Sequence, residues 1–381
     1  LEQLGPRVDL RDMSNVEVEG YGWAELREPE GVIDLGNSGT SMRTLLGVCS
    51  AIPGLSVLTG DASLRSRPML RVAAPLRQMG ASVYGRRHGE LPPLVVRGGG
   101  LDGIDFELPV PSAQVKTALL LAGLAASGQT SVTEPSRSRD HTERMLEAAG
   151  VPVEVDGTTY SVSAGEPGPR EWDVPGDISS ALYLLVAALL VPGSELTVTG
   201  VSLNPTRTAA LDVLRRMGAD IEVAEKETLS GEPRGDVTAR ASELAGAAID
   251  PEEVPRLIDE LPLLAVAASQ ADGETRIAGA AELRVKESDR IAAMVEGLKA
   301  LGCRAAETPD GMVVEGRSEI AGGAIDSRGD HRVAMSFAVA GLLSSEGVRV
   351  SRWSCVDTSF PGFLDVLGRA QGRVAPVDEA R

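Results

Sequence analysis

The chain has 381 residues, 43% apolar and 24% charged, which is ordinary for a globular protein and long enough for two domains. Its formal net charge of −18 disfavours nucleic acid and acidic membranes as partners, because a broad negative field repels phosphate groups. A small anion feels only its local site and is not excluded. Cys49, Cys303 and Cys355 stand singly, which fits a reducing cytoplasm. No uncharged apolar stretch reaches about 18 residues, so no membrane span is expected.

One pattern recurs about every 70 residues: a helix that ends in Leu-x-x-x-Gly, followed in most copies by a strand. Glycine is the residue that most readily adopts the left-handed conformation found at many helix ends. The pattern predicts helix ends at Gly5, Gly80, Gly150, Gly218, Gly302 and Gly368.

A second pattern interleaves with the first: a polar turn, an apolar helix, a glycine and a β-rich strand. Its closing glycines are Gly54, Gly128, Gly193, Gly273 and Gly347. Together the patterns predict an α/β fold of about six repeats, each with two helices among its strands. Because the second pattern lacks one copy, we expect the first repeat to be incomplete, with a further segment of about 60 residues before residue 1.

The apolar helices are apolar on nearly every side and should therefore be buried. Most begin with small polar residues or glycine, so their backbone N–H groups could bind an anion. Ordinary N-capping explains the same residue types, and for any single helix it is the simpler interpretation. Arg43, Lys116 and Arg332 lie near such helix starts, where the helix dipole opposes a cation, so we expect a bound anion to offset the repulsion.

Two arginines, Arg65 and Arg67, stand two residues apart before Pro68. On an extended segment they would face the same side and could hold a carboxylate or phosphate, although a solvated surface turn is equally consistent with the spacing. Asp259 and Glu260 precede an apolar helix, where they are either caps or, for Asp259, a positioned acid or base.

Two charged segments leave alternatives open. Residues 136–142 carry Arg139 beside His141 at the start of a helix, with Asp140 or Thr142 as its cap, and the histidine is expected to be structural. Residues 282–290 are the densest ionic run. If the run is helical, Lys286 and Arg290 share a face; otherwise it is a solvated surface or the entry to the following helix.

Nine strings carry a resemblance to a known family. In chain order, between residues 35 and 363, they are LGNSGTSMR, GDASLRSRPM, PSAQVKTALLLAGL, SRDHTERML, PGDISSALYLLVAAL, IDELPLLAVAA, ELRVKESDRI, DHRVAMSFAVAGL and TSFPGF. The chain resembles the 3-phosphoshikimate 1-carboxyvinyltransferases, a family of enolpyruvyl transferases.

The resemblance implies two domains, 1–174 and 175–381, each built from three βαβαββ units with helices inside, sheets outside and the active site in the interdomain cleft. It implies transfer of the enolpyruvyl group of phosphoenolpyruvate to the 5-hydroxyl of shikimate 3-phosphate, with release of phosphate. No metal or organic cofactor is implied, and a cytoplasmic monomer is expected.

The resemblance also implies the site residues. Asp259 takes the proton of the attacking hydroxyl, and Glu287 serves proton transfer at the methylene carbon. The residues for shikimate 3-phosphate are Ser112, Ala113, Gln114, Arg139, Asp259 and Lys286. The residues for phosphoenolpyruvate are Asn37, Gly39, Arg67, Gln114, Arg290 and Arg332.

Two departures from the family pattern stand out. The family's opening Pro-Gly-x-Lys-Ser turn, whose lysine touches both substrates, is expected in the preceding segment, and its echo at residues 175–180 carries Ile178 in place of the lysine. Thr358 stands where some relatives have a lysine.

One alternative function is that of a UDP-N-acetylglucosamine enolpyruvyl transferase, which needs a loop cysteine that none of the three cysteines matches. The other is an inactive or weakly anion-binding fragment that needs its preceding segment.

Overall fold

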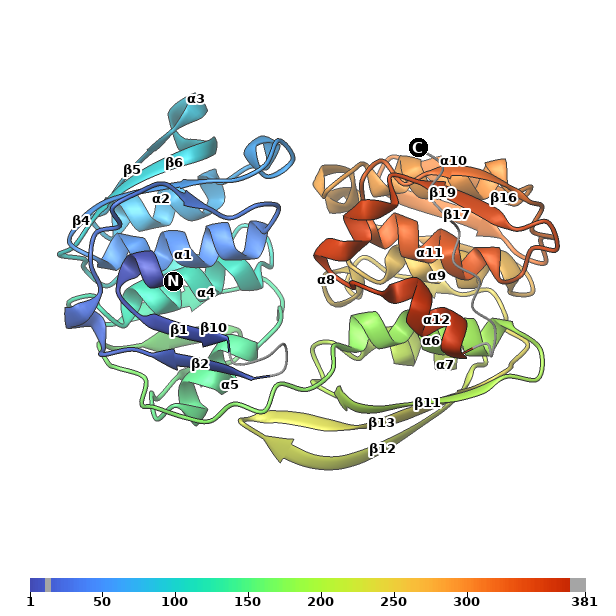
Figure 1. The fold of residues 1–381 in the computed structure, drawn as a ribbon, viewed down its shortest axis with the longest axis horizontal. Helices are drawn as coiled ribbons and strands as arrows, with labels where there is room; N and C mark the ends of the chain where they lie inside the picture. Colours follow the sequence, from blue (N-terminus) through green and yellow to red (C-terminus); the bar gives the residue numbers. More distant parts are fainter. Residues whose placement is uncertain (11–14, 371–381) are drawn as a thin grey trace. The chain divides into compact units, whose positions relative to one another are not determined.

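The computed structural model describes residues 1–10 and 15–370 and divides the chain into two compact units, Leu1–Trp172 and Asp173–Arg381 (Figure 1). Each unit has its own core, composed mainly of aliphatic side chains. The boundary expected from the sequence lies between residues 174 and 175, and the structural division lies between residues 172 and 173.

The repeated unit is complete in the middle of the first unit. An apolar helix joins two parallel strands, and a second helix leads into an antiparallel pair that completes the sheet in the order β3-β4-β6-β5. Parallel strands require a crossover of this kind, so the buried helix follows from the strand order. The elements are β3 (Ile33–Asp34), α1 (Gly39–Ala51), β4 (Gly54–Thr59), α2 (Leu70–Gln78), β5 (Ser82–Gly85) and β6 (Leu91–Gly98).

Two further copies have the same strand order. The first comprises β7 (Asp105–Glu107), α4 (Ala113–Gly123), β8 (Thr130–Thr133), α5 (His141–Ala148), β9 (Glu154–Asp156) and β10 (Thr159–Val162). The second comprises β14 (Ala248–Ile249), α9 (Leu261–Gln270), β15 (Glu274–Ile277), α10 (Arg290–Ala300), β16 (Arg304–Thr308) and β17 (Gly311–Glu315). The predicted βαβαββ repeat is therefore confirmed.

In another copy the first strand is reduced to a single parallel bridge, between Gly176 and Val201. Its other elements are α6 (Ile178–Leu190), β11 (Glu195–Ser202), α7 (Ala209–Arg216), β12 (Asp220–Leu229) and β13 (Glu232–Arg240). The remaining two sheets have two strands each within the described residues: β1 (Arg7–Leu10) with β2 (Val16–Glu19), and β18 (Gly323–Asp326) with β19 (Val348–Ser351), the latter accompanied by α11 (His331–Gly341) and α12 (Phe363–Ala370).

Short helices connect these elements. They are η1 (Glu2–Leu4), η2 (Trp23–Glu25), η3 (Leu64–Ser66), α3 (Arg86–Gly89), α8 (Val254–Leu257), η4 (Ala281–Val285) and η5 (Trp353–Thr358).

The glycines predicted to end the second helix of each repeat mostly do so. Gly80, Gly150, Gly218 and Gly302 have φ between 83° and 109°, and Gly5 follows η1 at φ 119°. The prediction for Gly368 is wrong, because this glycine lies within α12, which runs to Ala370. A glycine inside a helix costs only about 1 kcal/mol, which neighbouring packing can offset.

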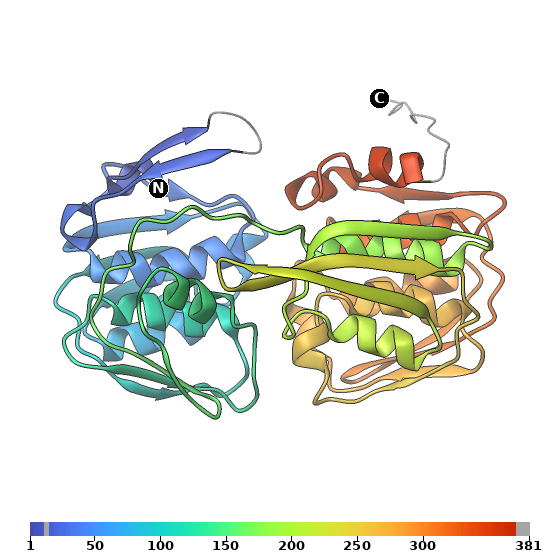
Figure 2. The same cartoon turned by 90° about the horizontal axis from the view of Figure 1, so that it is seen from below.

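The predicted burial of the apolar helices is confirmed. Every residue of α9 from Leu261 to Ser269 is buried, and Figure 2 shows the sheet of β11, β12 and β13 lying over α6. In the first unit α1 and α4 pack against each other so closely that a Cβ on Gly47 would lie 2.3 Å from the carbonyl oxygen of Ala118. Small residues in these helices therefore set how closely they approach.

Gly47→Ala should destabilise the first unit by about 1–3 kcal/mol, because the added methyl group would overlap the backbone of α4. Gly20→Ala is the control, since a Cβ there meets nothing within 4 Å. Urea unfolding measures both variants. Equal midpoints for Gly47→Ala and the unmodified chain would contradict the packing described.

Candidate functional site

The start of α1 brings together three residues predicted for phosphoenolpyruvate. Arg67 is 8% exposed, and its Nη2 donates to Oδ1 of Asn37 at 2.6 Å. A Cβ on Gly39 would lie 3.0 Å from Nη1 of Arg67 and 3.1 Å from Nη1 of Arg43. Glycine at this position therefore allows two guanidinium groups to lie against the first residue of the helix.

The neighbouring Arg65 does not share this arrangement. The segment forms the 3-10 helix η3 rather than an extended strand, so Arg65 points to solvent while Arg67 is buried. The extended alternative, in which both arginines face one side, is therefore wrong.

The start of α4 connects to the same place through Gln114. Its Oε1 accepts a hydrogen bond from Nη1 of Arg43, and its Nε2 donates to Oγ1 of Thr40 at 2.7 Å. Ser112 occupies the N-cap position of α4 but makes no side-chain cap hydrogen bond. The first turn of α4, which includes Ala113, therefore retains the N–H donors that can bind an anion.

Arg139 is half-buried in the loop before α5. The backbone N–H groups of Ser112 and Ser138 donate to the two oxygens of Glu134, each at 3.2 Å. One carboxylate thus fixes both the start of α4 and the residue before Arg139.

Lys116 has a different role from the one expected. It is fully buried, its Nζ lies 2.8 Å from Glu134 and 2.6 Å from Glu143, and it lies over the ring of Tyr160 at 4.0 Å. Burial lowers the pKa of Lys116, but the two carboxylates outweigh it and raise the pKa above its usual value. Internal ion pairs therefore offset the helix dipole, and the prediction of a ligand anion beside Lys116 is wrong.

In the second unit, Arg290 gathers several predicted residues. Its side chain is 2% exposed, and it donates from Nε to Asp330 at 2.8 Å, from Nη1 to Asp259 at 3.4 Å and from Nη2 to Glu287 at 2.6 Å. Burial lowers the pKa of Arg290, but the three carboxylates outweigh it and keep the pKa above its usual value. The proposed base Asp259 and the proposed proton carrier Glu287 thus lie on one guanidinium group.

Arg332 lies in the first turn of α11, where its backbone N–H donates to Asp330 at 2.9 Å. Burial raises the pKa of Tyr183 to about 12, against an opposing effect of Arg332. Arg332 is therefore close to the interior of the second unit as well as to the Arg290 cluster.

Lys286 is not on the helical face predicted for it. It follows η4, in extended conformation, and α10 begins only at Arg290. Its Nζ lies 3.4 Å from Glu282. The ionic run is therefore the entry to α10, one of the three alternatives, and the helical pairing of Lys286 with Arg290 is wrong.

Side-chain caps explain three of the five apolar helix starts. Ser38 caps α1, Asp177 caps α6 and Asp330 caps α11, whereas α4 and α9 have no side-chain cap hydrogen bond. Asp140 stands at the N-cap position of α5, makes no side-chain cap bond there and pairs with Arg144 at 3.0 Å.

The residues that neutralise or hold these groups are not evident from the sequence patterns. They are Glu134, Glu143, Asp330, Ser179 and Arg207. The Asn-Pro dipeptide at residues 204–205 marks a turn and could have drawn attention to Arg207.

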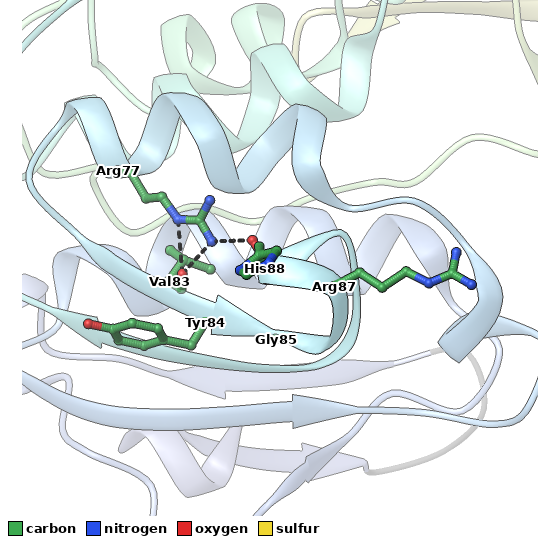
Figure 3. Close-up of a pocket in the computed structure, with 6 residues that line it drawn as sticks. All are labelled: Arg77, Val83, Tyr84, Gly85, Arg87 and His88. Carbon is green, nitrogen blue, oxygen red and sulfur yellow. Dashed lines mark hydrogen bonds between the residues drawn. The ribbon is translucent and has the colours of Figure 1, made fainter.

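A pocket elsewhere in the first unit contains none of the predicted site residues. It is lined by Arg77, Val83, Tyr84, Gly85, Arg87 and His88 (Figure 3). Arg77 donates to the carbonyl of Val83 at 2.9 Å and 2.6 Å and to that of His88 at 2.8 Å, so it holds the connection between β5 and β6. Across residues 1–10 and 15–370, no cluster of three metal-binding side chains occurs, and no helix is long and apolar enough to cross a membrane.

The repeated sheets and the charged groups at helix starts define an α/β enzyme fold suited to small anionic ligands. The family model of EPSP synthase (3-phosphoshikimate 1-carboxyvinyltransferase) matches residues 1–367. The chain belongs to the EPSP synthase family.

Individual relatives agree with this. A 3-phosphoshikimate 1-carboxyvinyltransferase of Anaeromyxobacter sp. (strain K) is 56% identical over 373 residues, covering 98% of this chain and 84% of the relative. One of Desulfitobacterium hafniense (strain DSM 10664 / DCB-2) is 51% identical over 368 residues, covering 96% and 84%. The preceding segment inferred from the repeats stays a prediction.

Solved structures show the same fold. An EPSP synthase from Acinetobacter baumannii has a TM-score of 0.86 at 44% identity, covering 97% of this chain and 85% of that chain. The enolpyruvyl transferase NikO from Streptomyces tendae has a TM-score of 0.67 at 16% identity, covering 90% and 95%, and shares the fold alone.

His331 should give the second unit a measurable pH dependence. Burial and Arg332 lower the pKa of His331 to about 4, although Asp330 opposes them. A histidine in the unfolded chain has a pKa near 6.5, so between about pH 6.5 and 4 the unfolded state binds a proton that the folded state excludes. We expect this to remove about 1–3 kcal/mol of stability as the pH falls through that range, with no effect above about pH 7.5.

Urea unfolding at several pH values measures the effect. His331→Asn should lose less stability on acidification than the unmodified chain, while the variant of the exposed His88, His88→Asn, should follow the unmodified chain. Parallel curves for His331→Asn and the unmodified chain would contradict the assignment.

Proposed function

We propose that this chain transfers the enolpyruvyl group of phosphoenolpyruvate to the 5-hydroxyl of shikimate 3-phosphate and releases phosphate. Family membership supports the reaction. The structural observation that carries the proposal is the contact of one buried guanidinium, that of Arg290, with both Asp259 and Glu287. In the proposed reaction, Asp259 accepts the hydroxyl proton and Glu287 carries the proton at the methylene carbon.

We assign shikimate 3-phosphate to the start of α4 and to residues that flank it or bear positive charge. The uncapped first turn of α4 offers N–H donors at the positive end of the helix dipole, and Arg139 offers a planar fork for phosphate. The assigned residues are Ser112, Ala113, Gln114, Arg139, Asp259 and Lys286.

We assign phosphoenolpyruvate to residues at the start of α1 and to two arginines of the second unit. The packing of Gly39 against the guanidinium of Arg67 supports this assignment, because any side chain at residue 39 would displace the donor. The assigned residues are Asn37, Gly39, Arg67, Gln114, Arg290 and Arg332.

The reaction then requires that the 5-hydroxyl loses its proton and that C3 of phosphoenolpyruvate gains a proton and later gives one up. Asp259 accepts the proton of the 5-hydroxyl as its oxygen bonds to C2 of phosphoenolpyruvate, while C3 gains a proton and becomes a methyl group. The resulting tetrahedral intermediate loses phosphate, and C3 returns a proton to give the enolpyruvyl ether. We propose that Glu287 carries the proton at C3. The arginines stabilise the negative charge of the phosphate and carboxylate groups throughout.

The UDP-N-acetylglucosamine alternative needs a reactive loop cysteine, which the structure disfavours. Cys49 and Cys303 are buried, Cys355 is half-buried, and burial raises the pKa of all three thiols. A raised pKa leaves little thiolate near neutral pH.

The three thiols form no disulfide, which supports a proposed cytoplasmic location. A monomeric state also stays a proposal.

The fragment alternative is tested by turnover. The chain of residues 1–381 is mixed with phosphoenolpyruvate and shikimate 3-phosphate, and phosphate release is followed. Release that depends on both substrates supports the proposed function. No release with either order of addition would favour the inactive or weakly anion-binding fragment.

Asp259→Asn should lower kcat by about 100-fold or more, because the amide cannot accept the hydroxyl proton, while shikimate 3-phosphate still binds. Phosphate release and calorimetric titration measure the two effects. Asp272→Asn is the matched control, since that carboxylate is exposed and pairs with Arg317 at 2.8 Å. An unchanged kcat in Asp259→Asn would exclude Asp259 as the base.

A further inference from the structure

A turn in the second unit presents an arginine that the scheme above does not use. Asn204 is fully buried, and its Oδ1 accepts hydrogen bonds from the backbone N–H and the hydroxyl of Thr206 at 2.8 Å and 2.6 Å. The side-chain amide of Asn204 donates to Glu232 at 2.9 Å, and its backbone carbonyl accepts the backbone N–H of Arg207 at 2.8 Å. These bonds fix the backbone from which the Arg207 side chain extends.

Arg207 joins the starts of two buried helices. Its Nη2 donates to Oδ1 of Asp177 at 3.2 Å and to the hydroxyl of Ser179, both at the start of α6. That hydroxyl donates in turn to Oε1 of Glu260, the residue before α9, and Nη2 of Arg207 lies 4.0 Å from the same oxygen. One cation and one hydroxyl therefore hold the Glu260 carboxylate against α6.

Because the charged groups of this cluster are largely buried, they need partners that compensate their charge. The Glu260 side chain is 2% exposed and that of Arg207 is 12% exposed. A buried carboxylate is strongly unfavourable unless a cation and hydrogen bonds compensate it. Burial raises the pKa of Asp177, but Arg207 and Arg332 outweigh it and hold the pKa below its usual range. Arg207 is thus within electrostatic reach of the same helix start as Arg332.

Glu260 is the chain neighbour of Asp259. Fixing the Glu260 side chain limits the backbone of the turn before α9, and with it the direction of the Asp259 carboxylate, which contacts Arg290 at 3.4 Å. A general base must lie within hydrogen-bond reach of the proton it removes, so small changes of direction matter.

We propose that Arg207 is a positioning residue for Asp259, acting through Ser179 and Glu260 rather than by touching substrate. This inference rests on the proposed function and extends it to a residue outside the substrate-contacting set.

Steady-state phosphate release by Arg207→Gln and Arg207→Lys tests the inference. Arg207→Gln should lower kcat by about 10- to 100-fold with both KM values within about 3-fold of the unmodified chain, as expected for misplacement of a reacting group. Arg207→Lys should recover part of the loss, because it restores a cation near Glu260. An unchanged kcat, or a loss confined to thermal stability, would overturn the proposal.

Arg216→Gln is the matched control. Arg216 belongs to the same unit and pairs with Glu253 at 2.8 Å on the exposed side of α7, so kcat should stay at the unmodified value. A fall in kcat as large as that of Arg207→Gln would overturn the proposal, since loss of an arginine that does not contact Glu260 would then lower kcat equally.

Milder variants cover the case in which Arg207→Gln does not fold. Ser179→Ala and Glu260→Gln each remove one link of the same chain and should lower kcat, and the double variant should lose less than the product of the two. Wild-type kcat in both single variants, or fully multiplicative losses, would overturn the proposal. Absence of turnover in the unmodified chain would instead overturn the proposed function, and this inference with it.

Discussion

The second unit depends on the burial of one arginine. Arg290 has almost no access to water, and it is tolerated because Asp330, Asp259 and Glu287 surround its guanidinium with hydrogen-bonded carboxylates. These partners come from the starts of α9, α10 and α11, so the ion pairs also fix where three buried helices begin. The helix starts are therefore positioned by charge as well as by apolar packing.

The first unit meets a related constraint with other residues. Lys116 is buried between Glu134 and Glu143, and Glu134 also accepts the N–H groups of Ser112 and Ser138. The ionic cluster thus lies behind the start of α4 and holds the backbone there. In both units the buried charges organise helix starts, and the N–H donors that remain at such starts are what an anionic substrate can use.

Much of the fold was predictable because its signals are local and repeated. Glycine at helix ends, apolar helices and β-rich segments recur at a regular spacing, and the structure confirms them except at Gly368. The site residues Asn37, Gly39 and Arg67, and likewise Asp259, Glu287 and Arg290, were named from motifs, and the structure brings each set together.

The remaining features depend on contacts between distant segments. Nothing local to Lys116 shows that Glu134 and Glu143 fold onto it. The spacing of Arg65 and Arg67 predicts different sides once the backbone is a 3-10 helix, a conformation that the spacing does not specify. Arg207 meets Glu260 across two repeats, so its position emerges only from the packing of α6 against α9.

We expect buried groups at helix starts, rather than surface charge in general, to bind the anionic substrates. Calorimetric titration with phosphoenolpyruvate at saturating shikimate 3-phosphate tests it on two neighbouring arginines, one buried and one exposed. We expect Arg67→Gln to weaken binding by about 10-fold or more, as loss of a charged hydrogen bond should, while Arg65→Gln stays within about 2-fold of the unmodified chain. Equal losses in the two variants, or a larger loss in Arg65→Gln, would contradict it.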